Sequence, residues 1–315
     1  MPNGVHHIPL ELPWSTPGNV NVYLIEENDG FVMIDCGVDG SEYLKLLEMH
    51  LNKLGITFND IKLLVGTHMH IDHIGLSQRL REFDIPFALY KNSIDYLDEY
   101  NDWSIRFKDL IKMAKNEYTP ASFIDDLKSI STPLYAGKLE KPDMLLSEGR
   151  IKSIRRNLNV VFTPGHDYSE ISLYDEKTKI VFSGDHILPR ITPFIPVQNE
   201  NSNLLKKFLD SLDKVDHLDQ EIIAPGHGNI ISNPHKRIEQ MKLHHQRRSE
   251  RILGFLKNED LTGWEITNKL FPRDLDSLNL RLAFQETLAH LHLLRSQKRV
   301  EKNNKNGVNK WALIN

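Results

Sequence analysis

Three histidines and one aspartate lie within the six residues 68–73. Residues 67–73 (THMHIDH) follow the apolar run 61–65 (IKLLV) after a single glycine. An apolar run of this length is typical of a buried strand, which would carry the polar side chains to the edge of a sheet. Imidazole nitrogens and carboxylate oxygens are common zinc ligands in proteins. The segment therefore predicts a metal site at the end of a strand.

Three further candidate ligands follow other short apolar runs. His166 comes after residues 160–162 (VVF), Asp185 after 180–182 (IVF) and His227 after 222–224 (IIA). A single His-x-His pair could be ordinary surface polarity, but four strand ends that all carry ligand-type residues form a pattern. The predicted metal ligands are therefore His68, His70, Asp72, His73, His166, Asp185 and His227.

This ordered set of residues resembles the metallo-β-lactamase superfamily of metal-dependent hydrolases, over roughly residues 5–235. The resemblance implies an α/β fold, the αββα sandwich of two mixed sheets with helices outside and metals at one sheet edge. It also implies that Asp185 bridges two ions and that Asp35 supports the metal-binding loop without binding metal. The alternative for Asp35 is a turn-forming role before a glycine.

The residues divide into two groups that could each hold an ion. His68, His70 and His166 would form a three-nitrogen site with one position open for solvent. Asp72, His73 and His227 would form the second site. Two zinc ions are the first choice of cofactor, and iron or manganese would also fit these ligands.

Paired ions can share a hydroxide that attacks a carbonyl carbon or a phosphorus, since coordination lowers the pKa of water from about 15.7 to about 7. Asp72 is the predicted catalytic residue, because its carboxylate could orient this nucleophile and shuttle a proton. The expected function is hydrolysis of a small ester, either a thioester or a lactone.

With 315 residues, the chain is long enough for a large domain and a smaller one. We expect a catalytic domain over residues 1–233, with a helical insertion at about 91–145, and a C-terminal domain over 234–315. In the latter, three predicted helices precede a hairpin at Asn306-Gly307, an order that resembles a winged-helix domain. The insertion would pack against the sandwich or form a pocket wall.

Composition narrows the class of protein. A hydrophobic content of 40%, a charged content of 26% and a net charge of −4 are ordinary for a soluble globular protein. The single cysteine, Cys36, excludes an intrachain disulfide and is expected to be a buried filler. Because the N-terminus has no signal-peptide pattern and no apolar run nears ~20 residues, we expect a cytoplasmic protein without a membrane partner.

Two residues are candidates for substrate binding. Arg190 follows Asp185 in a proline-stiffened segment and could bind a substrate carboxylate or phosphate, or pair with a neighbouring acid. Of the adjacent His244 and His245, His245 is the candidate for a pocket role, although a histidine pair on a helix is usually solvated or packed.

Two other functions compete with ester hydrolysis. Six lysines or arginines and one glutamate lie between residues 295 and 310, so the C-terminal hairpin could contact phosphates in an endoribonuclease or phosphodiesterase. A persulfide dioxygenase would need only one iron, held by part of the ligand set. A small-molecule substrate is the expected partner, nucleic acid is less favoured, and a homodimer is compatible with the sequence.

Overall fold

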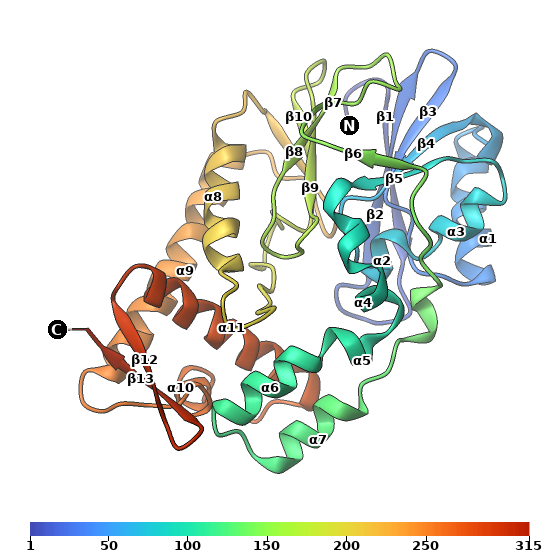
Figure 1. Ribbon diagram of the computed structural model, residues 1–315. Helices are drawn as coiled ribbons and strands as arrows, with labels where there is room; N and C mark the ends of the chain where they lie inside the picture. Colours follow the sequence, from blue (N-terminus) through green and yellow to red (C-terminus); the bar gives the residue numbers. More distant parts are fainter. Residues whose placement is uncertain (315) are drawn as a thin grey trace.

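The computed structural model describes residues 1–314 as two face-to-face β-sheets with helices on their outer faces (Figure 1). The first sheet is ordered β1(Val5–Glu11), β2(Asn19–Glu27), β3(Gly30–Ile34), β4(Ile61–Val65), β5(Phe87–Tyr90) and β6(Met144–Leu146). The second is ordered β11(Ile222–Pro225), β10(Ile180–Gly184), β9(Ile171–Asp175), β8(Leu158–Phe162) and β7(Gly149–Arg150). Both sheets mix parallel and antiparallel pairs, so the αββα sandwich is confirmed.

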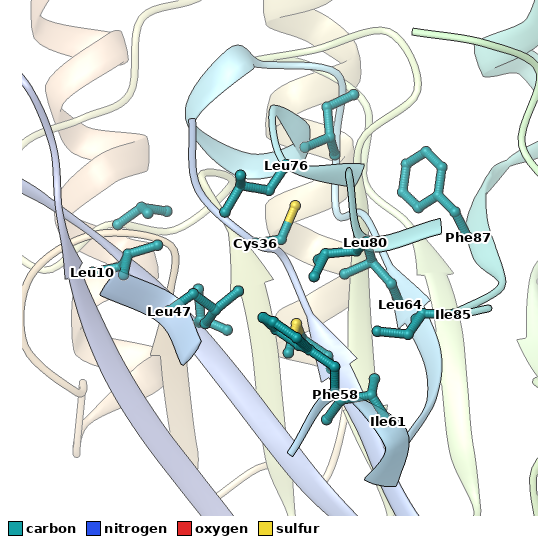
Figure 2. Close-up of a cluster of buried hydrophobic side chains, with 14 of the residues drawn as sticks. Leu10, Cys36, Leu47, Phe58, Ile61, Leu64, Leu76, Leu80, Ile85 and Phe87 are labelled. Carbon is teal, nitrogen blue, oxygen red and sulfur yellow. The ribbon is translucent and has the colours of Figure 1, made fainter. Parts of the chain in front are cut away.

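The central strands of the first sheet are mostly apolar on both faces because both faces are covered. In β2, Val22 and Leu24 pack in a cluster with Leu47 of helix α1 (Ser41–Lys53). Tyr23 and Ile25, which alternate with them, pack instead in the core between the sheets. Figure 2 shows the helix-side cluster, where the predicted buried position of Cys36 is confirmed.

The outer face of the second sheet is covered by α8(Leu204–Asp216) and α9(Pro234–Leu256). Phe208 of α8 and Met241 of α9 pack against Val181 and Ile223 of that sheet. The sequence analysis predicted neither α8 nor the strands β1, β5, β6, β7 and β9.

The segment between β5 and β6 is helical, as predicted. It contains α4(Leu97–Asn101), α5(Trp103–Arg106), α6(Lys108–Asn116) and α7(Ala121–Ser129). Tyr100 packs with the sandwich, but Leu110 and Phe123 pack in a different cluster with Phe284 and Trp311 near the C-terminus. The insertion therefore bridges the sandwich and the C-terminal elements.

The C-terminal elements follow the predicted order. After α9 come α10(Gly263–Leu270), α11(Ser277–Ser296) and the hairpin of β12(Val300–Lys305) and β13(Val308–Leu313). The sequence of residues 262–265 (TGWE) predicts a capping box of Thr262 and Glu265, and this capping box is present at the start of α10. The comparison of this unit with a winged helix stays a prediction, and no helix in residues 1–314 is long and apolar enough to cross a membrane.

Local structure around the first histidine cluster differs from expectation. The apolar spacing of residues 76 and 80 predicts a helix that begins near Gly75, after the ligands, but α2(Ile71–Ile74) already contains Asp72 and His73, and α3(Ser77–Arg81) follows. Strand β3 ends at Ile34 because Asp35 has a φ of 58°, a conformation rare for a residue other than glycine. The remaining short helices are η1(Phe58–Asp60), η2(Lys91–Tyr96) and η3(Leu134–Ala136).

Candidate metal centre

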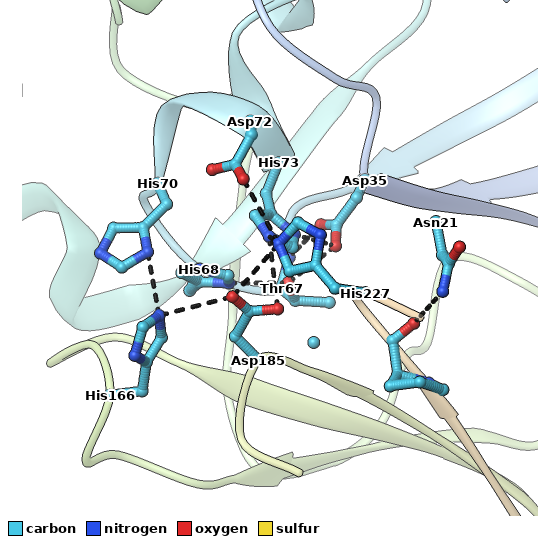
Figure 3. Close-up of polar contacts among 12 residues, drawn as sticks. Asn21, Asp35, Thr67, His68, His70, Asp72, His73, His166, Asp185 and His227 are labelled. Atoms are coloured by element: carbon cyan, nitrogen blue, oxygen red, sulfur yellow. Dashed lines mark hydrogen bonds and ion pairs between the residues drawn. The ribbon is translucent and has the colours of Figure 1, made fainter. Parts of the chain in front are cut away.

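The seven predicted ligand residues lie together at one edge of the sandwich, in the segments that follow β4, β8, β10 and β11 (Figure 3). They form two groups whose donor atoms lie within 4.8 Å of one another. The first group is His68, His70, His166 and Asp185, and the second is Asp72, His73 and His227. The six histidines and aspartates other than Asp185 divide as the sequence predicted, and Asp185, expected between the two ions, lies within reach of the first group's donor atoms.

Hydrogen bonds orient the imidazoles of the first group. Nδ1 of His68 lies 3.0 Å from Oγ1 of Thr67, which itself donates to Asp35. Nδ1 of His166 donates to the carbonyl oxygen of Phe194 at 2.7 Å. Because Nδ1 carries the proton in both rings, each Nε2 keeps a lone pair for a ligand. Nε2 of His68 is buried and has no hydrogen-bond partner within residues 1–314.

The second group is held in the same way. Nδ1 of His73 donates to Asp35 at 2.7 Å, and Nδ1 of His227 donates to the carbonyl oxygen of Asn19 at 2.6 Å. The two Nε2 atoms then face each other at 3.3 Å, and Oδ2 of Asp72 lies 3.3 Å from Nε2 of His227. Because both Nδ1 protons are used elsewhere, the two facing Nε2 atoms need either a proton or a metal ion between them, so the donor set fits a metal ion.

Asp185 lies between the two groups. Its Oδ2 is 3.6 Å from Nε2 of His166 and 3.4 Å from Nε2 of His227, and its Oδ1 is 3.5 Å from Nε2 of His73. A Cβ atom at Gly226 would lie 2.5 Å from Oδ1 of Asp185, so glycine leaves the room that this carboxylate needs. The arrangement allows one carboxylate to contact ions in both groups.

Burial and neighbouring charges set the protonation of the cluster. Burial lowers the pKa of His68 and His70 well below the ordinary value, which keeps both rings in the neutral form that binds metals. Burial would raise the pKa of Asp72, but His73 and His227 outweigh it and lower that pKa to about 2. Burial opposes the charge on His227, but Asp185 raises its pKa to about 10. A metal ion must therefore displace protons from the second group.

The metal centre opens on a cavity of about 230 Å³. His70 and Asp72 form its floor, and its apolar lining includes Trp103, Phe107, Leu110, Phe194, Val197 and Leu282. The guanidinium groups of Arg106 and Arg281 also line it, 5.4 Å from the Trp103 ring and 5.0 Å from the Phe107 ring. Neither guanidinium group has a hydrogen bond or an ion pair within the described residues.

Arg190 and His245, the predicted substrate-binding residues, do not line this cavity. Arg190 is exposed, in a segment that Arg237 of α9 holds through the carbonyl oxygens of Leu188 and Ile191. That contact turns the segment toward α9. His245 is buried on the inner face of α9, where its ring packs against Phe208.

A third group of ligand-type residues, His245, Glu286 and His290, lies between α9 and α11. Nδ1 of His245 and Nε2 of His290 are 3.3 Å apart and can satisfy each other. Glu286 forms an ion pair with Arg248, which leaves its charge compensated. This group is therefore explained without a metal ion.

Sequence reasoning missed several residues around the centre. Asn21 donates to the carbonyl oxygens of Pro225 and Gly228, on either side of His227. Arg106 and Arg281 come from the insertion and from α11, and no motif marks either of them. The asparagine pair at residues 19 and 21 in an otherwise apolar strand was the available signal for the first contact.

Comparison with known proteins agrees with this geometry. The model of the Metallo-beta-lactamase superfamily matches residues 15–227, and a Metallo-beta-lactamase-like, C-terminal domain matches residues 250–314. The chain is 26% identical over 304 residues to the probable metallo-hydrolase YqjP of Bacillus subtilis (strain 168), covering 90% of each protein. It is 23% identical over 233 residues to the acyl-coenzyme A thioesterase MBLAC2 of Gallus gallus, covering 69% of this chain and 76% of that protein.

A solved structure has the same fold over almost the whole chain. The metallo-beta-lactamase family protein TTHA1429 from Thermus thermophilus aligns with a TM-score of 0.82 and 26% identity, covering 99% of each chain. The family model covers well over half of the 315 residues, including all seven residues of the two groups. The chain therefore belongs to the metallo-beta-lactamase superfamily.

Proposed function

We propose that this metallo-hydrolase cleaves a small ester, most simply a thioester or a lactone, at the paired groups of histidines and aspartates. The observation that carries the proposal is that one residue of each group, His70 and Asp72, lines a largely apolar cavity. Two bound ions would supply Lewis acidity and lower the pKa of coordinated water to about 7. Zinc suits the nitrogen-rich donor set, and iron or manganese are the alternatives.

The protein's own residues would orient the reaction. Asp35 and Thr67 fix the rings of His68 and His73, so these nitrogens need no rearrangement when they bind an ion. Asp72 lines the cavity and also contacts His227. Its carboxylate can therefore accept a hydrogen bond from a proton-donating group that lies between the metal centre and the substrate. This position supports the catalytic role proposed for Asp72.

The cavity wall indicates the kind of substrate. Its apolar side chains would remove the acyl group of a substrate from water. The cavity therefore favours a substrate that carries such a group. Arg106 and Arg281 carry charges without a carboxylate partner in residues 1–314 and could bind an anionic group on the same substrate. The similarity to the acyl-coenzyme A thioesterase of Gallus gallus supports the thioester over the lactone.

The nuclease alternative relied on the basic hairpin. Lys302 pairs with Glu200, Arg299 with Glu250 and Lys310 with Glu265. Half of the six cations counted there are thus compensated by acids, which weakens a phosphate-binding role for the hairpin. We therefore keep ester hydrolysis as the proposal.

The proposal is tested by metal analysis together with a substrate panel. We expect about two equivalents of metal per chain and turnover of thioesters or lactones in preference to RNA. Asp185→Asn should abolish hydrolysis, because it removes a charge shared by both groups, while Asp210→Asn on the exposed face of α8 should be silent. One iron per chain with oxygen consumption would support the dioxygenase instead, and full activity of Asp185→Asn would refute the metal-centre assignment.

A further inference from the structure

A second cavity, of about 340 Å³, lies between α9 and the segment that follows Asp185. Five of its lining residues are arginines, and we call it the arginine groove: Arg190, Arg237, Arg247, Arg248 and Arg251. None of these residues lines the cavity at the metal centre. No lysine and no carboxylate lines the groove.

The spacing of the arginines along the chain places most of them on one face of a single helix. Four of them belong to α9, at positions 237, 247, 248 and 251. At 100° per residue these positions fall within an arc of about 100°, so they face one side of the helix over about 21 Å. Arg190 approaches from the opposite wall, since Arg237 binds the carbonyl oxygens of Leu188 and Ile191 at 2.6 and 2.7 Å.

The positive charges of the groove are mostly uncompensated. Only Arg248 has a carboxylate partner within residues 1–314, namely Glu286. Arg237 and Arg251 donate only to backbone carbonyls and to the neutral side-chain amide of a glutamine, which carry no net charge. The side chains of Arg190 and Arg247 have no partner in the same residues.

This concentration of like charge favours the binding of an anion. Burial, with a smaller contribution from Arg251, lowers the pKa of Arg248 to about 10. The chain as a whole has a net charge of −4, so the groove is positive against an acidic background. An anion in the groove would therefore relieve repulsion that the rest of the protein does not offset locally.

The use of arginine alone indicates the chemistry of that anion. The planar guanidinium fork binds phosphate through two parallel hydrogen bonds, whereas lysine binds it as a point charge. Several arginines over one face suit two or more linked phosphates better than a single carboxylate. Leu243, which is 41% exposed and lines the groove, offers an apolar contact for the organic part of the ligand.

The groove lies next to the metal-centre cavity. Thr192 lines the groove and Phe194 lines the cavity, so their Cα atoms are at most about 7 Å apart. We infer that the arginine groove binds the linked phosphates of a nucleotide-like small molecule, at a site adjacent to the metal centre. This goes beyond the proposed ester hydrolysis, and the phosphates could belong to a free nucleotide or to the non-reacting part of the substrate.

The primary experiment measures binding by the metal-loaded protein, with adenosine diphosphate, pyrophosphate and inorganic phosphate as probes. The diphosphates should bind more tightly than phosphate. The double substitution Arg190→Gln with Arg247→Gln should weaken the binding of adenosine diphosphate at least about tenfold, because each substitution removes a charge-assisted contact. The matched control is Arg155→Gln with Arg273→Gln, two exposed arginines outside the groove, which changes the net charge equally and should retain binding.

The result has clear outcomes that do not depend on hydrolysis. Equal binding by the groove variant and the wild type would place the phosphates at the metal centre and overturn the inference. Binding of single-stranded RNA that needs the two arginines, without binding of adenosine diphosphate, would overturn the small-molecule assignment as well.

A second arm separates the two sources of phosphate. If the phosphates belong to the substrate, the groove variant should raise KM for a thioester that carries a nucleotide diphosphate and not for one that lacks it. If a free nucleotide is the ligand, adenosine diphosphate should bind without competing with either thioester. Failure to hydrolyse any ester would reject the proposed function while leaving the binding result intact.

Discussion

Glu117 joins the helical insertion to the C-terminal domain through three hydrogen bonds. Its Oε2 accepts from the backbone nitrogen of Gly263 at 2.7 Å and from Nε1 of Trp311 at 3.0 Å, and its Oε1 accepts from Nδ2 of Asn309 at 2.8 Å. The side chain lies at the end of α6 and is 2% exposed. Since the insertion and α11 of the C-terminal domain both line the cavity at the candidate metal centre, this contact helps to hold two parts of the cavity wall together.

We expect Glu117→Ala to be strongly destabilising. It leaves three buried donors without a partner, each at a cost of about 1–3 kcal/mol. Water entry and relaxation reduce the sum, so we predict a loss of about 3–5 kcal/mol in the free energy of unfolding, against about 5–15 kcal/mol for a typical protein. Glu117→Gln keeps the size and one acceptor oxygen, and should lose about half as much.

Urea unfolding followed by tryptophan fluorescence measures this loss, because Trp264 and Trp311 report on the C-terminal domain. The control is Asp109→Ala, an exposed carboxylate on the same helix, which should change stability by less than about 0.5 kcal/mol. If the free energies of unfolding of Glu117→Ala and Asp109→Ala lie within about 1 kcal/mol of each other, the three hydrogen bonds do not hold the insertion and the C-terminal domain together, and the reasoning is wrong.

Three further predictions concern the cavity, acid stability and metal binding. Arg106→Gln should raise KM about tenfold for an anionic ester and leave a neutral ester unaffected, as steady-state kinetics with a matched substrate pair would show. Burial lowers the pKa of His290 well below 6.5, so this residue's contribution to stability is present above pH 6.5 and is lost as the pH falls. In urea unfolding at pH 6.5 and pH 5.5, the free energy of unfolding of the wild type should fall by about 1 kcal/mol more than that of His290→Gln. Because His227 has a pKa of about 10, zinc binding should release protons, and calorimetric enthalpies that are identical in buffers of different ionisation enthalpy would contradict this.

The sequence was sufficient to locate the candidate metal centre because the candidate ligands all lie in the short segments that follow four apolar strands. In a sandwich of this kind those strands end at the same edge, so His68, His166, Asp185 and His227 had to meet once the strands paired. The fold class followed from the same pattern together with the resemblance to one superfamily. Boundaries were less certain, as the early start of α2 at Ile71 shows, because a helical turn can begin at a residue whose spacing also fits an extended segment.

The tertiary structure decided which surfaces surround that centre. Arg106 and Arg281 belong to helices with no common motif, and they reach one cavity only because the insertion packs against α11. Arg190 was expected near the metal ions, but the bonds of Arg237 to Leu188 and Ile191 hold its segment beside α9. Local sequence sets strands and ligand spacing, whereas the direction of a surface side chain depends on non-local contacts, so it was fixed only when the helices had packed.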